Sequence, residues 1–67
     1  MNNNSKIILQ YLQSVYKNCG KNVFEDFDVV RNVGLSNEDY IAAINELESL
    51  GYIEKWIFGL KLEVDFN

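Results

Sequence analysis

The residues from Val33 to Phe66 constrain the fold most, because signals for a turn, a helix and two strands follow one another there. A glycine-containing turn at residues 33–35 leads to Ser36, a residue type that commonly caps the N-terminus of a helix. Gly51 supplies the left-handed backbone position that ends such a helix. Two short segments of alternating polarity then flank residues 58–60, as the strands of a β-hairpin would.

The helix predicted after Ser36 has the clearest pattern in the chain. Asp39 stands three residues on, which makes a variant of the capping box with Asp in place of Glu. Five residues share its apolar face, with Ile41 at the edge: Tyr40, Ala43, Ile44, Leu47 and Leu50. The opposite face carries Glu38, Ala42, Asn45, Glu46 and Ser49. We interpret the apolar face as core, and Tyr40 as a core aromatic.

An earlier helix is predicted from Ser5, as its N-cap, to about Asn18, with Gly20 just past its end. Its apolar stripe comprises Ile8, Leu12, Val15 and Cys19, flanked by Tyr11 and Tyr16. Cys19 is the only cysteine, and the chain has no histidine to activate it. We therefore interpret Cys19 as a small buried side chain.

A second, short helix is predicted next, at about 25–33. The proposed core positions of this helix are Phe27, Val30 and Val33. Its first turn is acidic and Arg31 lies in its last turn, as the helix dipole favours. The acidic residues lack the spacing of a calcium loop, so we interpret them as solvated and expect no metal site.

The alternating pattern of the hairpin, together with the length of its loop, predicts which side chains face the core. If the loop has two residues, at 58–59 or 59–60, odd positions of the first strand share a face with even positions of the second. The inner face then holds Ile53, Ile57, Leu62 and Val64. The outer face holds Tyr52, Trp56, Phe58, Lys61 and Glu63. Lys55 falls on the inner side and is tolerated if its stem reaches an edge. A longer loop or a bulge would reverse this assignment.

The chain is short, which limits both its architecture and its chemistry. Its 67 residues predict one domain at 5–67, preceded by a disordered N-terminus at 1–4. We expect no enzyme, no catalytic residues and no cofactor, because histidine is absent and so small a domain has little room for a closed pocket. Without a signal peptide, a long apolar run or paired cysteines, the expected location is cytoplasmic, with no membrane contact.

Charge is unevenly distributed along the chain. Three lysines and no acid lie in residues 1–23, whereas residues 24–67 hold three cations and all ten acids, so the net charge is −4. The helix at 36–50 has no Lys or Arg and four carboxylates. Acidic protein near phosphate forgoes the counterion release that dominates affinity for DNA. This pattern argues against strong, nonspecific DNA binding, but not against weak specific binding by a dimer.

Several residues nevertheless resemble a known family. Leu35-Ser36, then Ile44 and Leu47, then the run Leu50-Gly51-Tyr52-Ile53 are similar to the pattern of bacterial winged helix-turn-helix domains. The resemblance covers about residues 5–66. It implies an α+β fold with three helices and a two-stranded antiparallel wing, joined by a short strand near Val23-Phe24. It also implies a small DNA-binding transcriptional regulator of bacterial or phage origin, able to act as a homodimer on double-stranded DNA.

In that family, the exposed face of the third helix reads bases and the wing holds phosphates. Transferred to this chain, the base-reading residues are Asn37, Asn45 and Ser49. The phosphate-binding residues are Lys55 and Lys61, to which the residue pattern adds Lys17. The missing Lys or Arg on the helix departs from the family, and Glu38 and Glu46 would repel phosphate.

The alternative function is a protein–protein interaction module that does not bind DNA. Its partner surface would be Tyr52, Trp56 and Phe58 on the hairpin, or the acidic helix through Glu38 and Glu46, including mimicry of DNA. In a competing interpretation, the first helix or the Asn-rich terminus covers Trp56 and makes it core. A stripe of cations from Lys6 and Lys17 to Lys61 would favour DNA, and scattered cations would favour protein.

Overall fold

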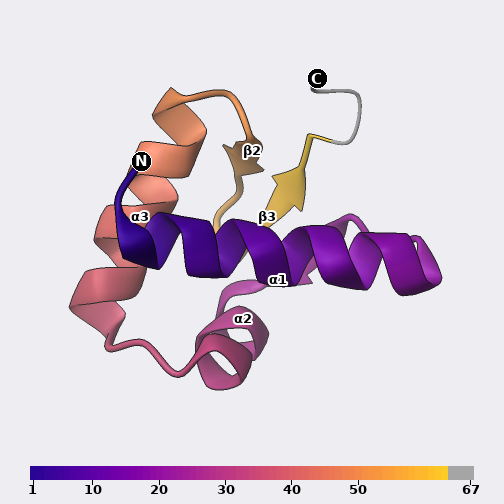
Figure 1. Ribbon diagram of the computed structural model, residues 1–67, viewed down its shortest axis with the longest axis horizontal. Helices are drawn as coiled ribbons and strands as arrows, with labels where there is room; N and C mark the ends of the chain where they lie inside the picture. Colours follow the sequence, from indigo (N-terminus) through magenta and orange to yellow (C-terminus); the bar gives the residue numbers. More distant parts are fainter. Residues whose placement is uncertain (64–67) are drawn as a thin grey trace.

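The computed structural model describes residues 1–63, which form three helices and three strands (Figure 1). In chain order these are α1 (Asn3–Cys19), β1 (Val23–Glu25), α2 (Asp26–Val33), α3 (Asn37–Ser49), β2 (Ile53–Lys55) and β3 (Gly59–Leu62). The strands make one antiparallel sheet in the order β1-β3-β2. The α+β class and the short strand at Val23-Phe24 are confirmed.

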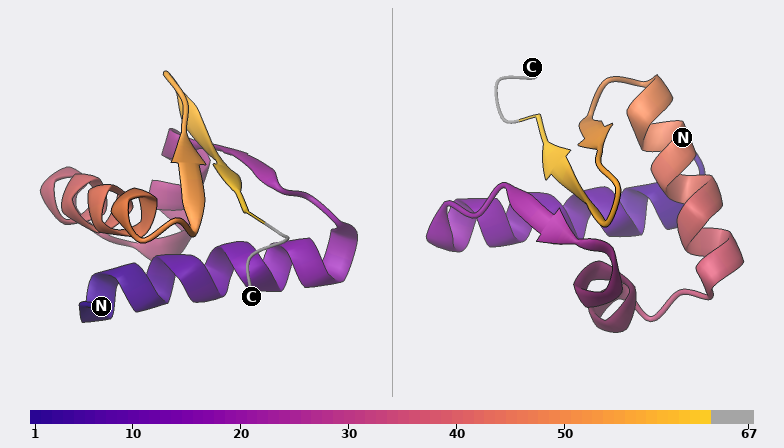
Figure 2. Two further views of the ribbon diagram at one scale, coloured as in Figure 1. Left: turned by 90° about the horizontal axis from the view of Figure 1, so that it is seen from above. Right: turned by 180° about the vertical axis from the view of Figure 1, so that it is seen from behind.

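The core lies where α1, α3 and the sheet meet (Figures 1 and 2). The largest fully buried apolar side chains are Ile8, Leu12, Val29, Ile44, Leu47 and Leu60. The apolar face predicted for α3 is confirmed at four positions, because Tyr40, Ala43, Ile44 and Leu47 are buried. Leu50 and Ile41 are instead half-exposed, since they lie at the edges of that face.

Helix α1 begins earlier than predicted, and Ser5 is not its cap. The side chain of Asn2 accepts a hydrogen bond from the Ser5 N–H at 3.0 Å, so Asn2 is the N-cap, and Asn3 and Asn4 are helical. Ser5 is fully buried, and its hydroxyl donates to the Ala43 carbonyl of α3. The sequence could not reveal this, because Asn and Ser are equally good caps and only the contact with α3 decides between them.

The turns around α3 agree with the prediction. The Ser36 side chain accepts a hydrogen bond from the Asp39 N–H at 3.2 Å, which satisfies one of the free donors at the start of the helix. At the other end Gly51 has φ of 84°, a conformation that glycine adopts without strain. Helix α1 likewise ends at Gly20 in the left-handed conformation.

In α1 and α2, one side chain each that was predicted as core is exposed. Phe27 of α2 is 61% exposed, whereas Val29 is fully buried in its place. Helix α2 is held at its start by a hydrogen bond from the Asp26 N–H to the Phe58 carbonyl. Cys19 is exposed because the last turn of α1 extends past the sheet and α3 (Figure 1).

In the hairpin, odd positions of β2 pair with even positions of β3, as predicted, but the loop consists of different residues. Ile53 pairs with Leu62 and Lys55 with Leu60, and the Trp56 N–H donates to the Gly59 carbonyl at 2.8 Å. The loop residues are therefore 57–58, not 58–59 or 59–60. Ile53 and Leu62 face the core as predicted, and Lys55 is exposed at the edge. Ile57, predicted to face inward, is 87% exposed at the tip, and Val64 lies outside the described residues.

Candidate interaction surface

The exposed face of α3 is polar and acidic. Asn37, Glu38, Asn45 and Ser49 are exposed, as the helical pattern predicted. No residue of α3 is Lys or Arg. The Ser49 hydroxyl donates to the Glu46 carbonyl one turn back at 2.8 Å, so it already has a partner in its own helix.

Glu46 lies on the side of α3 that meets the start of α1. Its carboxylate accepts a hydrogen bond from the Asn2 N–H at 3.0 Å. The Ser5 hydroxyl, together with this N–H, lowers the pKa of the Glu46 carboxyl. The sequence-based interpretation of Glu46 as a partner-binding residue missed this role: the carboxylate joins the two helices and complements the positive end of α1.

Glu48 also acts within the molecule. Its carboxylate accepts a hydrogen bond from the Lys55 N–H at 3.2 Å, on the outer edge of β2. That edge of the sheet is therefore shielded by α3. The sequence analysis gave Glu48 no role, because only the turn at Gly51 brings the end of α3 beside β2.

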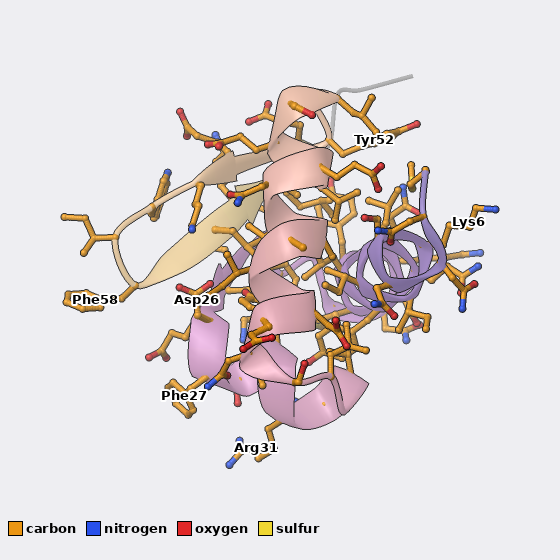
Figure 3. All side chains as sticks on the ribbon, turned by 90° about the vertical axis from the view of Figure 1, so that its left-hand side faces the viewer. Lys6, Asp26, Phe27, Arg31, Tyr52 and Phe58 are labelled. Carbon is orange, nitrogen blue, oxygen red and sulfur yellow. The ribbon has the colours of Figure 1, made fainter. Side chains whose placement is uncertain are left out.

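The cations are scattered over the described part of the chain. Figure 3 shows Lys6 and Phe58 on opposite sides of α3. Lys17 lies eleven residues after Lys6, or about 16 Å further along α1. Lys61 is half-buried at the centre of the sheet. Two other cations already face Asp28: its carboxylate lies 2.7 Å from Arg31 and 3.9 Å from Lys21.

The hairpin extends away from α1 (Figure 2). Its tip carries three consecutive exposed apolar side chains. Trp56 is 46%, Ile57 87% and Phe58 84% exposed. The Trp56 indole N–H donates to the Glu54 carboxylate at 3.0 Å. Trp56 is therefore not covered by α1 or by the Asn-rich start of the chain, and the competing interpretation of Trp56 as core is wrong. Apolar side chains gathered in this way commonly mark an interface.

A shallow, largely apolar hollow of about 550 Å³ lies on the outer face of the sheet beside this tip. We call it the tip hollow. Its border is formed by Val23 and Glu25 of β1, Gly59 of β3, and Trp56, Ile57 and Phe58. The register explains this grouping, because Gly59 pairs with Glu25 on one side and bonds to Trp56 on the other. Any other residue at position 59 would place a side chain between Glu25 and Trp56, whereas Gly59 places none there.

Glycine is required at position 59 because another part of the backbone packs closely against it, and not because of a turn conformation. The sequence analysis placed it in the loop, yet it begins β3 and is not among the glycines with positive φ. A Cβ at this position would meet the Phe24 carbonyl oxygen of β1 well within van der Waals contact. The absence of a side chain therefore lets β1 and β3 approach, and Gly59 also lines the tip hollow.

A second hollow lies between the two helices α2 and α3 and the start of the hairpin. It is bordered by Asp26, Phe27, Arg31, Asn37, Ile41 and Lys55. At its base the Tyr40 hydroxyl donates to the Asp26 carboxylate at 2.6 Å. Burial, and then the bond to Asp26, raise the pKa of the Tyr40 hydroxyl above its ordinary value. This pair connects α2 to α3 and accounts for the buried position of Tyr40.

The three aromatic residues that were predicted to form one surface lie in two separate places. Tyr52 is half-buried against the core, and its N–H donates to the Leu47 carbonyl at 3.0 Å. Figure 3 places Tyr52 near the end of α3 and Phe58 far from it at the tip of the hairpin. Trp56 and Phe58 thus remain together on one surface, whereas Tyr52 belongs to the base of the hairpin.

No protein-family model, curated protein or solved structure matches this chain. Within residues 1–63, no three acidic, Cys or His side chains gather closely enough to hold a metal ion. Over the same residues, no helix combines the length and apolarity needed to cross a membrane.

Proposed function

We propose that this chain is a small protein-binding module of winged-helix type, which contacts its partner through the tip of the hairpin. The observation that carries the proposal is the exposure of Trp56, Ile57 and Phe58 in succession, beside an apolar hollow. Tryptophan is enriched among the residues that contribute most to protein interfaces. An apolar, aromatic surface of this kind suits a protein partner better than the phosphates of DNA.

The winged-helix part of the proposal is supported by the succession of elements. Helices α2 and α3 are joined by a short turn, and β2 and β3 form a hairpin immediately after α3. The sheet order β1-β3-β2 agrees with the strand expected near Val23-Phe24. In this arrangement the hairpin is the wing, and α3 is the helix that would read DNA in a regulator.

DNA binding is the second candidate function, and one observation favours it. Asn37 and Asn45 are exposed on α3, and Lys55 lies beside the same face. The scattered cations and the acidic helix weigh against it. A salt titration on mixed duplex DNA tests it: if the wing contacts phosphate, replacing Lys55 and Lys61 with Ala flattens the slope of log affinity against log salt by up to about 2.

The test of the main proposal uses the full chain as bait for a phage-displayed library of random dodecapeptides. Peptides that bind are synthesised and their affinities measured by calorimetry. Trp56→Ala should weaken binding at least about tenfold, because it removes the central aromatic side chain. The matched control is Ile41→Ala, which removes an equally exposed apolar side chain from α3 and should change affinity less than about twofold.

Both variants should stay folded, with free energies of unfolding within about 1 kcal/mol of the wild type, because both side chains are half-exposed. Peptides whose binding is unaffected by Trp56→Ala would contradict the proposal. So would tight, salt-dependent binding to duplex DNA that depends on the wing lysines.

A further inference from the structure

Among residues 1–63, β1 pairs only with β3, so its other edge has no neighbouring strand there and lies beside the tip hollow. The Leu62 N–H donates to the Asn22 carbonyl at 2.7 Å, and the Asp26 N–H to the Phe58 carbonyl at 2.9 Å. In an antiparallel pair, the residues that bond to the neighbouring strand alternate with residues that face away from it. Phe24 of β1, like Asn22 and Asp26 on either side of the strand, therefore bonds toward β3, and Val23 and Glu25 present their backbone groups to the other side.

Three backbone groups at this edge are available to another strand. They are the N–H and C=O of Val23 and the N–H of Glu25, for which residues 1–63 provide no hydrogen-bond partner. The Glu25 carbonyl is excluded, because Glu25 is the N-cap residue of α2 and its carbonyl accepts within that helix. The opposite edge of the sheet differs, since Glu48 already binds the Lys55 N–H there.

We propose that the open edge of β1 and the tip hollow together bind an extended, basic segment of a partner protein. This inference rests on the proposed protein-binding function and specifies its mode. The segment adds to the sheet as a fourth strand beside β1, so that main-chain hydrogen bonds supply affinity and alternate side chains supply specificity. One large apolar side chain reaches over β1 into the tip hollow.

Charge complementarity determines the chemistry of the partner. Among the described residues that border the tip hollow, Glu25 alone is charged, and it is exposed on the outer face of β1. A strand beside β1 therefore places a Lys or Arg opposite Glu25, which stabilises the pair, whereas a carboxylate there is repelled. A second copy of this acidic chain is less suited to the edge, because its own β1 carries the same Glu25.

The spacing of the partner residues also follows from the geometry. Val23 and Glu25 lie two residues apart on the same face of β1. The partner residues opposite them are also two apart, since side chains of a strand alternate between faces. Peptides selected from the dodecapeptide library should therefore contain a large apolar residue and a Lys or Arg two positions from it, in either order.

The closing experiment uses one selected peptide and two analogues that carry N-methyl groups at alternate amides. One analogue blocks the amides that face β1, and the other blocks those that face away, so each is the matched control of the other. Strand addition predicts that one analogue loses at least about tenfold in affinity while the other keeps it. Equal binding of both analogues, with dependence on Trp56 retained, overturns strand addition and leaves the protein-binding function standing.

Two substitutions of Glu25 measure separately how much its backbone N–H and its negative charge contribute to peptide binding. Glu25→Pro removes the outward N–H without strain, because Glu25 has φ of −86°, close to the value that proline adopts. It should weaken binding about tenfold. Glu25→Gln keeps the N–H and removes the charge, and should weaken binding about two- to fivefold. Peptides that bind without any dependence on Trp56 defeat the proposed function and this inference together. A stable dimer that protects the Val23 N–H from exchange without peptide overturns this inference alone.

Discussion

At the scale of single residues, Gly59 joins the fold to the candidate surface. Its missing side chain lets the Phe24 carbonyl of β1 approach β3, and Gly59 also lines the tip hollow, between Glu25 and Trp56. A residue with a side chain here would separate the strands and fill the hollow at once. The fold and the candidate binding surface therefore depend on the same position.

We predict that Gly59→Ala destabilises the chain by about 1–3 kcal/mol, the usual cost of forcing extra atoms into a packed site. The added Cβ meets backbone, which yields less readily than a flexible side chain. Denaturant unfolding followed by circular dichroism measures the change. A free energy of unfolding equal to that of the wild type would mean that β1 and β3 do not approach as closely as described.

The sequence predicts some residues well and others poorly, for one physical reason. The cap at Ser36 and the left-handed Gly51 are local chemistry, which can be read from a few neighbouring residues. The outward position of Phe27 depends on how α2 packs against distant parts of the chain, and that of Ile57 on where the hairpin loop falls. The backbone requirement at Gly59 has no sequence signal apart from glycine itself.

At the scale of elements, the two long helices are joined by polar contacts as well as by the core. Glu46 of α3 binds the first turn of α1 through the Asn2 N–H, and the Ser5 hydroxyl reaches the Ala43 carbonyl. These contacts explain why α1 begins at Asn3, before the position that its own pattern predicted. Helix boundaries were thus less predictable than the existence of the helices.

We predict a pH-dependent contribution from Glu46. Its pKa is lowered in the folded chain, so its carboxylate stabilises the fold above the ordinary glutamate pKa of 4.5, and this contribution is lost as the pH falls through the folded value. Glu46→Gln keeps the shape and removes the charge. Its stability deficit should be present at pH 7 and shrink below about pH 4. A deficit that stays constant across this range in urea unfolding would exclude the charge of Glu46 as its cause.

We also predict that Leu47→Ala costs roughly 2–5 kcal/mol, enough to unfold a domain with marginal stability. Leu47 is fully buried at the centre of the apolar face of α3. Leu50→Ala is the control, because Leu50 is half-exposed at the edge of that face. Thermal unfolding of both variants checks the expectation. A cooperatively folded Leu47→Ala with nearly wild-type stability would discredit the packing of α3 against α1.

At the scale of the whole molecule, the distribution of charge and apolar surface separates the two candidate functions. The acidic helix and the scattered cations offer little to a phosphate backbone, whereas the hairpin presents apolar side chains next to an open strand edge. The order of the helices and the hairpin could be predicted from sequence, because periodicity and turn residues encode them, whereas the strand β1 was expected only from the resemblance to winged helices. The open edge of β1 could not be predicted, since it arises only when β3 pairs between β1 and β2.

The fluorescence of Trp56 tests the central claim most directly, because it is the only tryptophan and it lies in the proposed interface. Emission and iodide quenching are measured on the free chain, with its mass in solution, and again at saturation with a selected peptide. The account predicts red-shifted, readily quenched emission from the free monomer, followed by a blue shift and loss of quenching on binding. Blue-shifted, quencher-resistant emission from a free monomer, or emission that peptide leaves unchanged, would contradict it.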